Sequence, residues 1–186
     1  MKFSVIKLIT IITQDLSYCD PALKDAFHQE GKKVFRHLAK LMGIKPDDYD
    51  VRSNKAGIAV SGEVTLHTAS VYVQLSQPVV DGEHVLLMRS CQGRDDYTGG
   101  MNHFAPAEAL QDLNRLAVYL EGVSRNQVCG MYWNPDQVRI DVAHIRANKI
   151  ISPELERVRD RFEADEIPIE AFEYAIESAE RRRMAA

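Results

Sequence analysis

Residues that could carry chemistry gather in one stretch, from His84 to Phe104. This stretch opens with an apolar run typical of a strand, turns polar, and continues as a loop that contains three glycines. Cys91 and His103 flank the loop, and a thiol activated by an imidazole is the pair that cysteine nucleophiles use in catalysis. No third group that would orient the imidazole is identifiable, and a cysteine at a strand end is usually a buried apolar residue. An enzyme built on these two residues is therefore the least favoured interpretation.

The same stretch contains potential metal ligands, namely Asp95, Asp96, His103 and His84. Adjacent aspartates point apart in extended backbone, so they rarely bind one ion together. The calcium-loop pattern, with its fixed spacing and terminal glutamate, is absent. The two aspartates are better interpreted as acceptors for loop amides or as partners of nearby arginines. The sequence therefore predicts neither a metal nor a cofactor.

A recognition role fits the loop better. Its glycines allow backbone N–H groups to approach an anion, a tyrosine is available to stack on a base, and long loops are often functional. The predicted binding residues are Arg52, Lys55, Arg89, Arg94, Asp95, Asp96, Tyr97 and His103. Two partners remain open. One is a protein that docks on Gln92–Met101 with Arg94 and Tyr97 as anchors. The other is a nucleic acid that contacts the basic residues and Tyr97.

Composition limits these alternatives. The 186 residues are 45% hydrophobic and 27% charged, which is usual for one globular domain with an appendage. Residues 152–186 hold ten acidic and six basic side chains and so account for the net charge of −4, whereas residues 1–151 hold 17 of each. A neutral body has no charge imbalance that demands nucleic acid.

Three widely spaced cysteines predict reduced thiols in a cytoplasm. The apolar N-terminal run is interrupted by Lys7 and Thr10, and we expect no membrane span.

Periodicity predicts the elements that position the loop. Apolar residues three and four apart favour a helix over residues 3–16, although the β-branched residues of this run would also suit a strand. The same spacing predicts a second helix over residues 20–43, which begins at an Asp-Pro pair and ends at Gly43. From Tyr49 the apolar residues alternate, and turns rich in glycine and asparagine separate the runs. This pattern predicts an antiparallel meander of about four strands. The two N-terminal helices would pack on its apolar face, so the predicted fold class is α+β.

The remainder of the chain is predicted to be an appendage to this fold. A further helix is expected from Ala105-Pro106 to Gly122. Apolar residues alternate from Val138 to Val142, which predicts a strand in this region. We therefore divide the chain into an α+β domain over residues 1–122, an extension over 123–151 and a C-terminal segment.

The C-terminal segment, residues 152–186, carries the pattern of two short amphipathic helices with a tight connection. One such helical hairpin buries too little apolar surface to be stable alone. It must pack either on its own chain or on a copy of itself. Self-association into a homo-oligomer through this segment is therefore expected as one of two outcomes.

Three runs of the chain resemble small uncharacterised proteins encoded by bacterial phages and plasmids. They are LSYCDPALKDAFHQEGKKVFRHL, DVRSNKAGIAVSGEVTLHTASVYVQLSQ and RSCQGRDDYTGGMNHF, and the similarity covers roughly residues 1–121. That group has no established activity, so the resemblance implies a bacterial cytoplasm and no catalytic residue. The C-terminal segment is similar to short helical-hairpin modules at the ends of bacterial proteins, except that Asp165–Pro168 replaces their usual glycine.

Together, the loop and the resemblance favour a non-enzymatic phage or mobile-element protein. It would bind a host protein in the cytoplasm and so modulate host or defence machinery. The alternative is a nucleic-acid-binding module that uses the loop over residues 89–101 and the basic residues near it. No membrane partner is expected.

Overall fold

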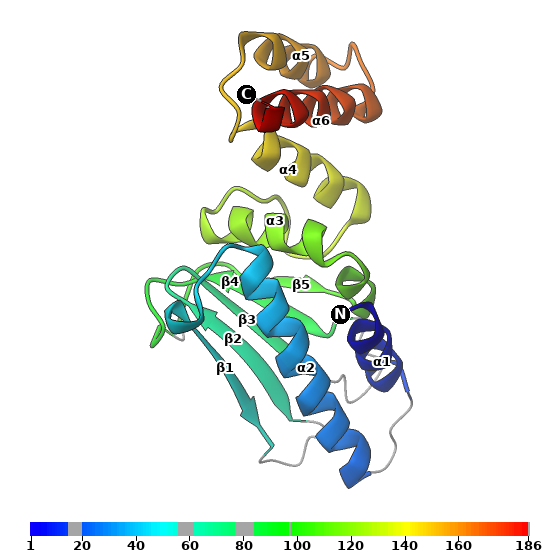
Figure 1. Cartoon of the computed structure of the whole chain (residues 1–186), viewed down its shortest axis with the longest axis vertical. Coiled ribbons are helices and arrows are strands. Elements are labelled where there is room, and N and C mark those ends of the chain that lie inside the picture. Colours follow the sequence, from blue (N-terminus) through cyan, green and yellow to red (C-terminus); the bar gives the residue numbers. More distant parts are fainter. Residues whose placement is uncertain (15–19, 56–61, 77–83, 97, 186) are drawn as a thin grey trace. The chain divides into compact units, whose positions relative to one another are not determined.

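The structure is a computed structural model that describes residues 1–14, 20–55, 62–76, 84–96 and 98–185. Within these ranges it contains six α-helices and one five-stranded antiparallel sheet, which confirms the predicted α+β class. The chain divides into two compact units, Met1–Trp133 and Asn134–Ala186 (Figure 1). Within the described part of the chain, no helix combines the length and the apolar character needed to cross a bilayer.

The first unit begins with helices α1 (Lys2–Ile12) and α2 (Pro21–Leu41). Both were predicted from the apolar stripe. The carboxylate of Asp20 accepts the Ala22 N–H at 2.8 Å and so caps α2, and the proline that follows needs no hydrogen-bond partner. Gly43, with φ of +72°, follows the end of the helix as expected.

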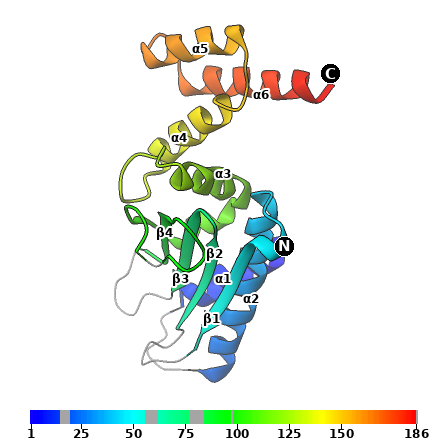
Figure 2. The same cartoon turned by 90° about the vertical axis from the view of Figure 1, so that its left-hand side faces the viewer.

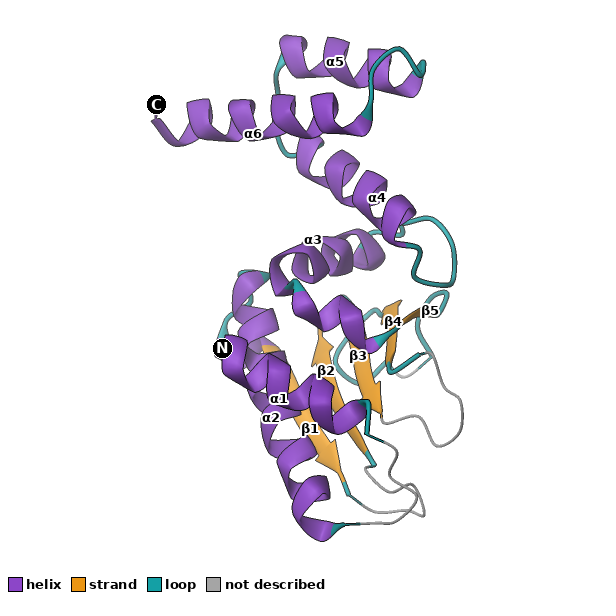
Figure 3. Cartoon of the chain, turned by 90° about the vertical axis from the view of Figure 1, so that its right-hand side faces the viewer, coloured by secondary structure: helices purple, strands orange, loops and turns teal. Residues whose placement is uncertain are grey.

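The sheet is a meander in which every strand is antiparallel to its neighbours, in the order of the sequence. It has one strand more than the four or so that the alternation predicts. Both N-terminal helices lie on one side of it (Figure 3). On that side, Leu66, Val73 and Met88 are opposite one another on neighbouring strands and fully buried. The strands are β1 (Tyr49–Asn54), β2 (Glu63–Thr68), β3 (Val71–Ser76), β4 (Leu86–Ser90) and β5 (His103–Ala105).

The helix predicted from Ala105 to Gly122 is interrupted. The chain first forms the 3-10 helix η2 (Ala107–Gln111), and α3 (Leu113–Ser124) then begins separately. Asp112 causes this restart, because its carboxylate accepts the Arg115 N–H at 3.0 Å and caps the new helix. Of the two pieces, η2 packs beside α1 and α3 packs beside α2.

The strand predicted from Val138 to Val142 is wrong. These residues belong to helix α4 (Pro135–Ala147), which Asn134 caps by accepting the N–H groups of Asp136 and Gln137. The buried residues of α4 recur three and four apart, which is the helical period. The alternation that suggested a strand spans only five residues, too few to distinguish the two periods.

The second unit consists of α4, α5 (Pro153–Glu163) and α6 (Ile169–Ala185). The helical hairpin α5–α6 packs on α4 of the same chain. This is the first of the two expected arrangements, in which the hairpin packs on its own chain. Arg139 of α4 binds Glu170 of α6 at 2.8 Å, and Arg146 binds Glu180 at 2.6 Å. The core that joins the three helices is Ala143, Ala147, Leu155, Phe172, Ile176 and Ala179.

Candidate functional site

Asp96 organises the loop between β4 and β5. Its carboxylate accepts the backbone N–H of Gln92 at 2.9 Å, and the N–H and hydroxyl of Thr98 at 2.9 and 2.7 Å. It also accepts the N–H of Gly99 at 3.2 Å. These bonds favour the ionised carboxyl and hold the pKa of Asp96 far below its usual value. Of the glycine amides predicted to approach an anion, that of Gly99 therefore already binds a carboxylate of the chain itself, and that of Gly100 donates to a backbone carbonyl.

Gly99 closes the loop against the end of β4. Its φ is +51°, and a Cβ at this position would lie 2.5 Å from the carbonyl oxygen of Ser90. Gly100 then donates its N–H to the same oxygen at 2.8 Å. Only glycine fits at position 99, so this glycine serves the geometry of the loop.

The loop lies over the face of the sheet that the helices leave uncovered (Figure 2). His67 of β2 is on this face and is 1% exposed. Burial lowers its pKa, and so does the nearby Arg52, while hydrogen bonds to the backbone of Asp96 and Gly93 act in the opposite direction. A neutral imidazole beneath the loop thus connects it to the sheet.

The basic residues predicted to bind a partner are engaged within the chain. Arg94 donates to the carbonyl oxygen of Asp47 at 2.6 Å and lies 3.4 Å from the carboxylate of Asp50. Arg52 pairs with the same carboxylate at 3.1 Å. Lys55 forms an ion pair with Asp25 of α2. These side chains are 40–51% exposed, but their charge is compensated by acids of the protein.

The other predicted binding residues have different surroundings. The guanidinium of Arg89 lies over the ring of Tyr72 at 4.7 Å from its centre, which is a cation–π contact within the sheet. Asp95 is exposed on the loop. Tyr97, the predicted aromatic anchor, lies outside the described residues. The structure therefore brings Arg52 and Arg94 together at Asp50, but it does not form one basic surface from the predicted set.

The pairing of the strands separates Cys91 and His103. His103 is opposite Met88 of β4. Cys91 follows Met88 by three residues, which at the usual rise of a strand places it about 10 Å further along the direction of β4. His103 is 4% exposed and donates from Nδ1 to the carbonyl oxygen of Gly130 at 2.8 Å. Burial raises the pKa of the Cys91 thiol, so it is protonated at neutral pH and is a poor nucleophile. Across the described ranges, no cluster of three or more histidines, cysteines, aspartates or glutamates could hold a metal ion.

The structure shows exposed apolar residues beside β5 that the site prediction missed. Residues 131–133 run parallel to β5, with the Phe104 N–H donating to Met131 at 2.7 Å and the Trp133 N–H donating to Phe104 at 2.8 Å. Tyr132 is 60% exposed, and the neighbouring Met131 is 43% exposed. Met101, just before β5, is 51% exposed. We call these three residues, Met101, Met131 and Tyr132, the methionine–tyrosine surface.

Two aromatic rings support Tyr132 from behind. Its ring stacks on His84 with a centroid separation of 5.1 Å, and on Phe104 at 5.8 Å. The contact from His103 to Gly130 fixes the backbone beside both methionines. The Met-Tyr-Trp run is visible in the sequence, but its position beside β5 depends on a pairing that periodicity does not reveal.

Comparison of the chain with protein-family models, with curated proteins and with solved structures found no match.

Proposed function

We propose that this protein is a non-enzymatic binding protein and that another protein docks on the methionine–tyrosine surface. The observation that carries the proposal is the 60% exposure of Tyr132, a large aromatic side chain held in place by His84 and Phe104. Isolated exposed apolar residues are ordinary, whereas an exposed aromatic ring held by two stacked rings, next in sequence to an exposed methionine, supports an interaction surface.

The residue types favour a protein partner. Tyrosine and methionine are enriched in the centres of protein interfaces, where a few side chains supply most of the binding energy. Methionine adapts its unbranched side chain to the shape of the partner. Tyr132 is already stacked, so little side-chain freedom would be lost when it is covered. The partner's matching surface would be apolar and weakly charged.

The backbone offers a second contact. Because Met131 and Trp133 direct their hydrogen-bonding groups at Phe104, strand alternation directs the N–H and C=O of Tyr132 away from β5. An extended segment of the partner could pair with this residue while its apolar side chains contact the methionines. In the bacterial setting that the sequence resemblance implies, the partner would be a host protein, and its capture would modulate host or defence machinery.

The charge distribution argues against nucleic acid as the partner. Arg52, Arg94 and Lys55 are paired with acids of the same chain, and Asp96 occupies the loop amides. A phosphate backbone would have to displace these contacts, and nucleic-acid affinity depends mainly on basic side chains that can neutralise phosphates.

The test is capture of a partner from a bacterial lysate on the immobilised full chain. We expect a protein that remains bound after nuclease treatment and at 0.5 M salt, because contacts between apolar surfaces are little screened by salt. It should be lost with Tyr132→Ser and retained with Tyr174→Ser, which changes a tyrosine of α6 that is 68% exposed. Binding that nuclease or 0.5 M salt removes would instead support the nucleic-acid alternative.

A further inference from the structure

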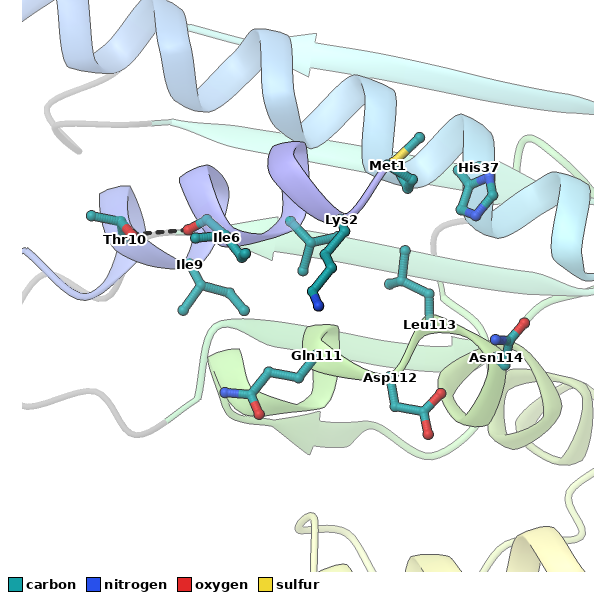
Figure 4. A pocket seen from close by; sticks show the side chains of 11 residues that line it. Met1, Lys2, Ile6, Ile9, Thr10, His37, Gln111, Asp112, Leu113 and Asn114 are labelled. Atoms are coloured by element: carbon teal, nitrogen blue, oxygen red, sulfur yellow. Dashed lines mark hydrogen bonds between the residues drawn. The ribbon is translucent and has the colours of Figure 1, made fainter.

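The first unit contains a pocket of about 510 Å³ beside the N-terminal helix. It lies between α1, α2 and the segment where η2 passes into α3, and it shares no residue with the methionine–tyrosine surface (Figure 4). Its volume is within the range of sites for small molecules. The lining residues are Met1, Lys2, Val5, Ile6, Ile9, Thr10, His37, Gln111, Asp112, Leu113 and Asn114.

One side of the pocket is an apolar wall. Helix α1 buries Leu8 and Ile11 in the core of the unit, yet it also presents apolar residues on its other side. Ile6 is 55% exposed and Met1 is 49% exposed, and both line the pocket with Ile9. Apolar side chains on two sides of one helix exceed what packing in the core requires, so the outer side has another role.

The pocket places one ammonium group, that of Lys2, beside the apolar wall. The side chain of Lys2 points from α1 toward Gln111 and Asp112 (Figure 4). The Asp112 carboxylate is already committed to α3, since it accepts the Arg115 N–H at 3.0 Å and lies 3.7 Å from the Arg115 guanidinium. Within the described ranges no carboxylate lies within ion-pair distance of Lys2. The ammonium group is therefore available to an anionic group beside the apolar wall.

From this combination we propose that the pocket binds an amphipathic carboxylate. The hydrocarbon body of the ligand lies against Ile6, Ile9 and Leu113, and its carboxylate accepts hydrogen bonds from the ammonium of Lys2. Burial of the apolar chain supplies most of the affinity, and the charge-assisted contact fixes the orientation. This activity is separate from the proposed protein binding and does not depend on it.

The experiment titrates the full chain with decanoate and, in parallel, with decanol, a neutral molecule of the same chain length. Methyl resonances of Ile6, Ile9 and Leu113 report binding at the pocket. We expect saturable shifts with decanoate, and an affinity at least about tenfold lower in Lys2→Glu, since a charge-assisted hydrogen bond is lost and a like charge is introduced. Decanol should bind both proteins equally.

Two further variants complete the test. Lys45→Glu makes the same charge change at an exposed lysine that does not line the pocket, so it should bind decanoate as the unmodified chain does. Ile6→Ser alters the apolar wall at a position that is half exposed, so it should weaken binding of both molecules without unfolding the protein.

Three results would overturn the proposal. The first is the absence of saturable shifts at the pocket methyls, and the second is equal decanoate affinity in Lys2→Glu and Lys45→Glu. The third is a molecular mass in solution, without ligand, that exceeds the mass of one chain and returns to it in Ile6→Ser. The last result would show that a second copy of the chain covers the α1 surface. None of these readouts involves Tyr132, so failure here is distinguishable from failure of the proposed protein binding.

Discussion

At the scale of single residues, Asp96 decides what the loop can do. Its carboxylate binds the amides of Gln92, Thr98 and Gly99 and so takes the place of an external anion. The short spacing of Asp96 and Thr98 is typical of an aspartate that accepts amides just after it, so this role was predictable in kind. That Asp96 has the role, and the adjacent Asp95 does not, depends on how the loop folds back on the sheet.

We expect Asp96→Ala to loosen the loop. The amides of Gln92, Thr98 and Gly99 lose their acceptor, so they should exchange with deuterium markedly faster than in the unmodified protein. Asp95→Ala is the matched control, because it removes a neighbouring exposed carboxylate and should leave these rates unchanged. Equal acceleration in both variants would refute the structural role of Asp96.

His67 should make stability depend on pH. Because the pKa of the folded-state imidazole is lowered from 6.5, the unfolded chain binds more protons as the pH falls below that value. The free energy of unfolding should therefore decrease between pH 7.5 and 5.5, by at most about 1.4 kcal/mol for this group. The lowered pKa values of Glu30 and Asp96 affect stability only below their ordinary values of 4.5 and 3.8.

Urea denaturation at the two pH values measures this effect. The decrease should be smaller in His67→Gln, which keeps hydrogen-bonding groups but does not titrate in this range. An identical decrease in both proteins would mean that the buried imidazole does not contribute.

At the scale of elements, periodicity succeeded where a segment was long. The 21 residues of α2 repeat the helical spacing many times and have clear signals at both ends, so α2 was predicted nearly to its ends. The five residues from Val138 to Val142 fit a strand and a helix equally, and the capping by Asn134 resolves the choice. The restart of α3 at Asp112 was missed because one apolar stripe spans both pieces.

The contact of α2 with the sheet depends on Gly31. A Cβ at this position would lie 3.2 Å from Val64 and 3.3 Å from Leu75 on the sheet. We expect Gly31→Leu to force the helix from the strands and to lower the free energy of unfolding by roughly 1–3 kcal/mol. Gln29→Leu, at an exposed position of the same helix, should change it little. Thermal unfolding compares the two, and similar stabilities would contradict the close packing.

The second unit depends on Phe172 of α6, which is fully buried in the core that α6 forms with α4 and α5. Phe172→Ala leaves a cavity, so we expect the free energy of unfolding of this unit to fall by about 3–5 kcal/mol. Hydrogen exchange of the α6 amides in the full chain should accelerate accordingly. Tyr174→Ala, on the exposed side of α6, is the control, and a comparable effect of this variant would contradict the assigned core.

At the scale of the whole molecule, composition and alternation were sufficient for the α+β class and for the helices that cover the sheet. They were insufficient for the surface of the site. Tyr132 reaches Phe104 across 28 residues of sequence through a bridge that no local pattern predicts. Arg94 was placed correctly on a loop. Its partners are far away in the sequence, since Asp50 lies on β1 and Asp47 lies just before that strand. Charges that look available in a sequence are often paired in the fold.

The central claim is that the methionine–tyrosine surface binds a protein. Its most direct test is the dissociation constant of the captured partner for the unmodified chain, Tyr132→Ser and Tyr174→Ser at equal salt. Loss of an aromatic anchor at an interface centre costs about 2 kcal/mol or more, so Tyr132→Ser should weaken binding at least about thirtyfold. Tyr174→Ser should leave the constant unchanged. Equal affinity of all three proteins would contradict the claim.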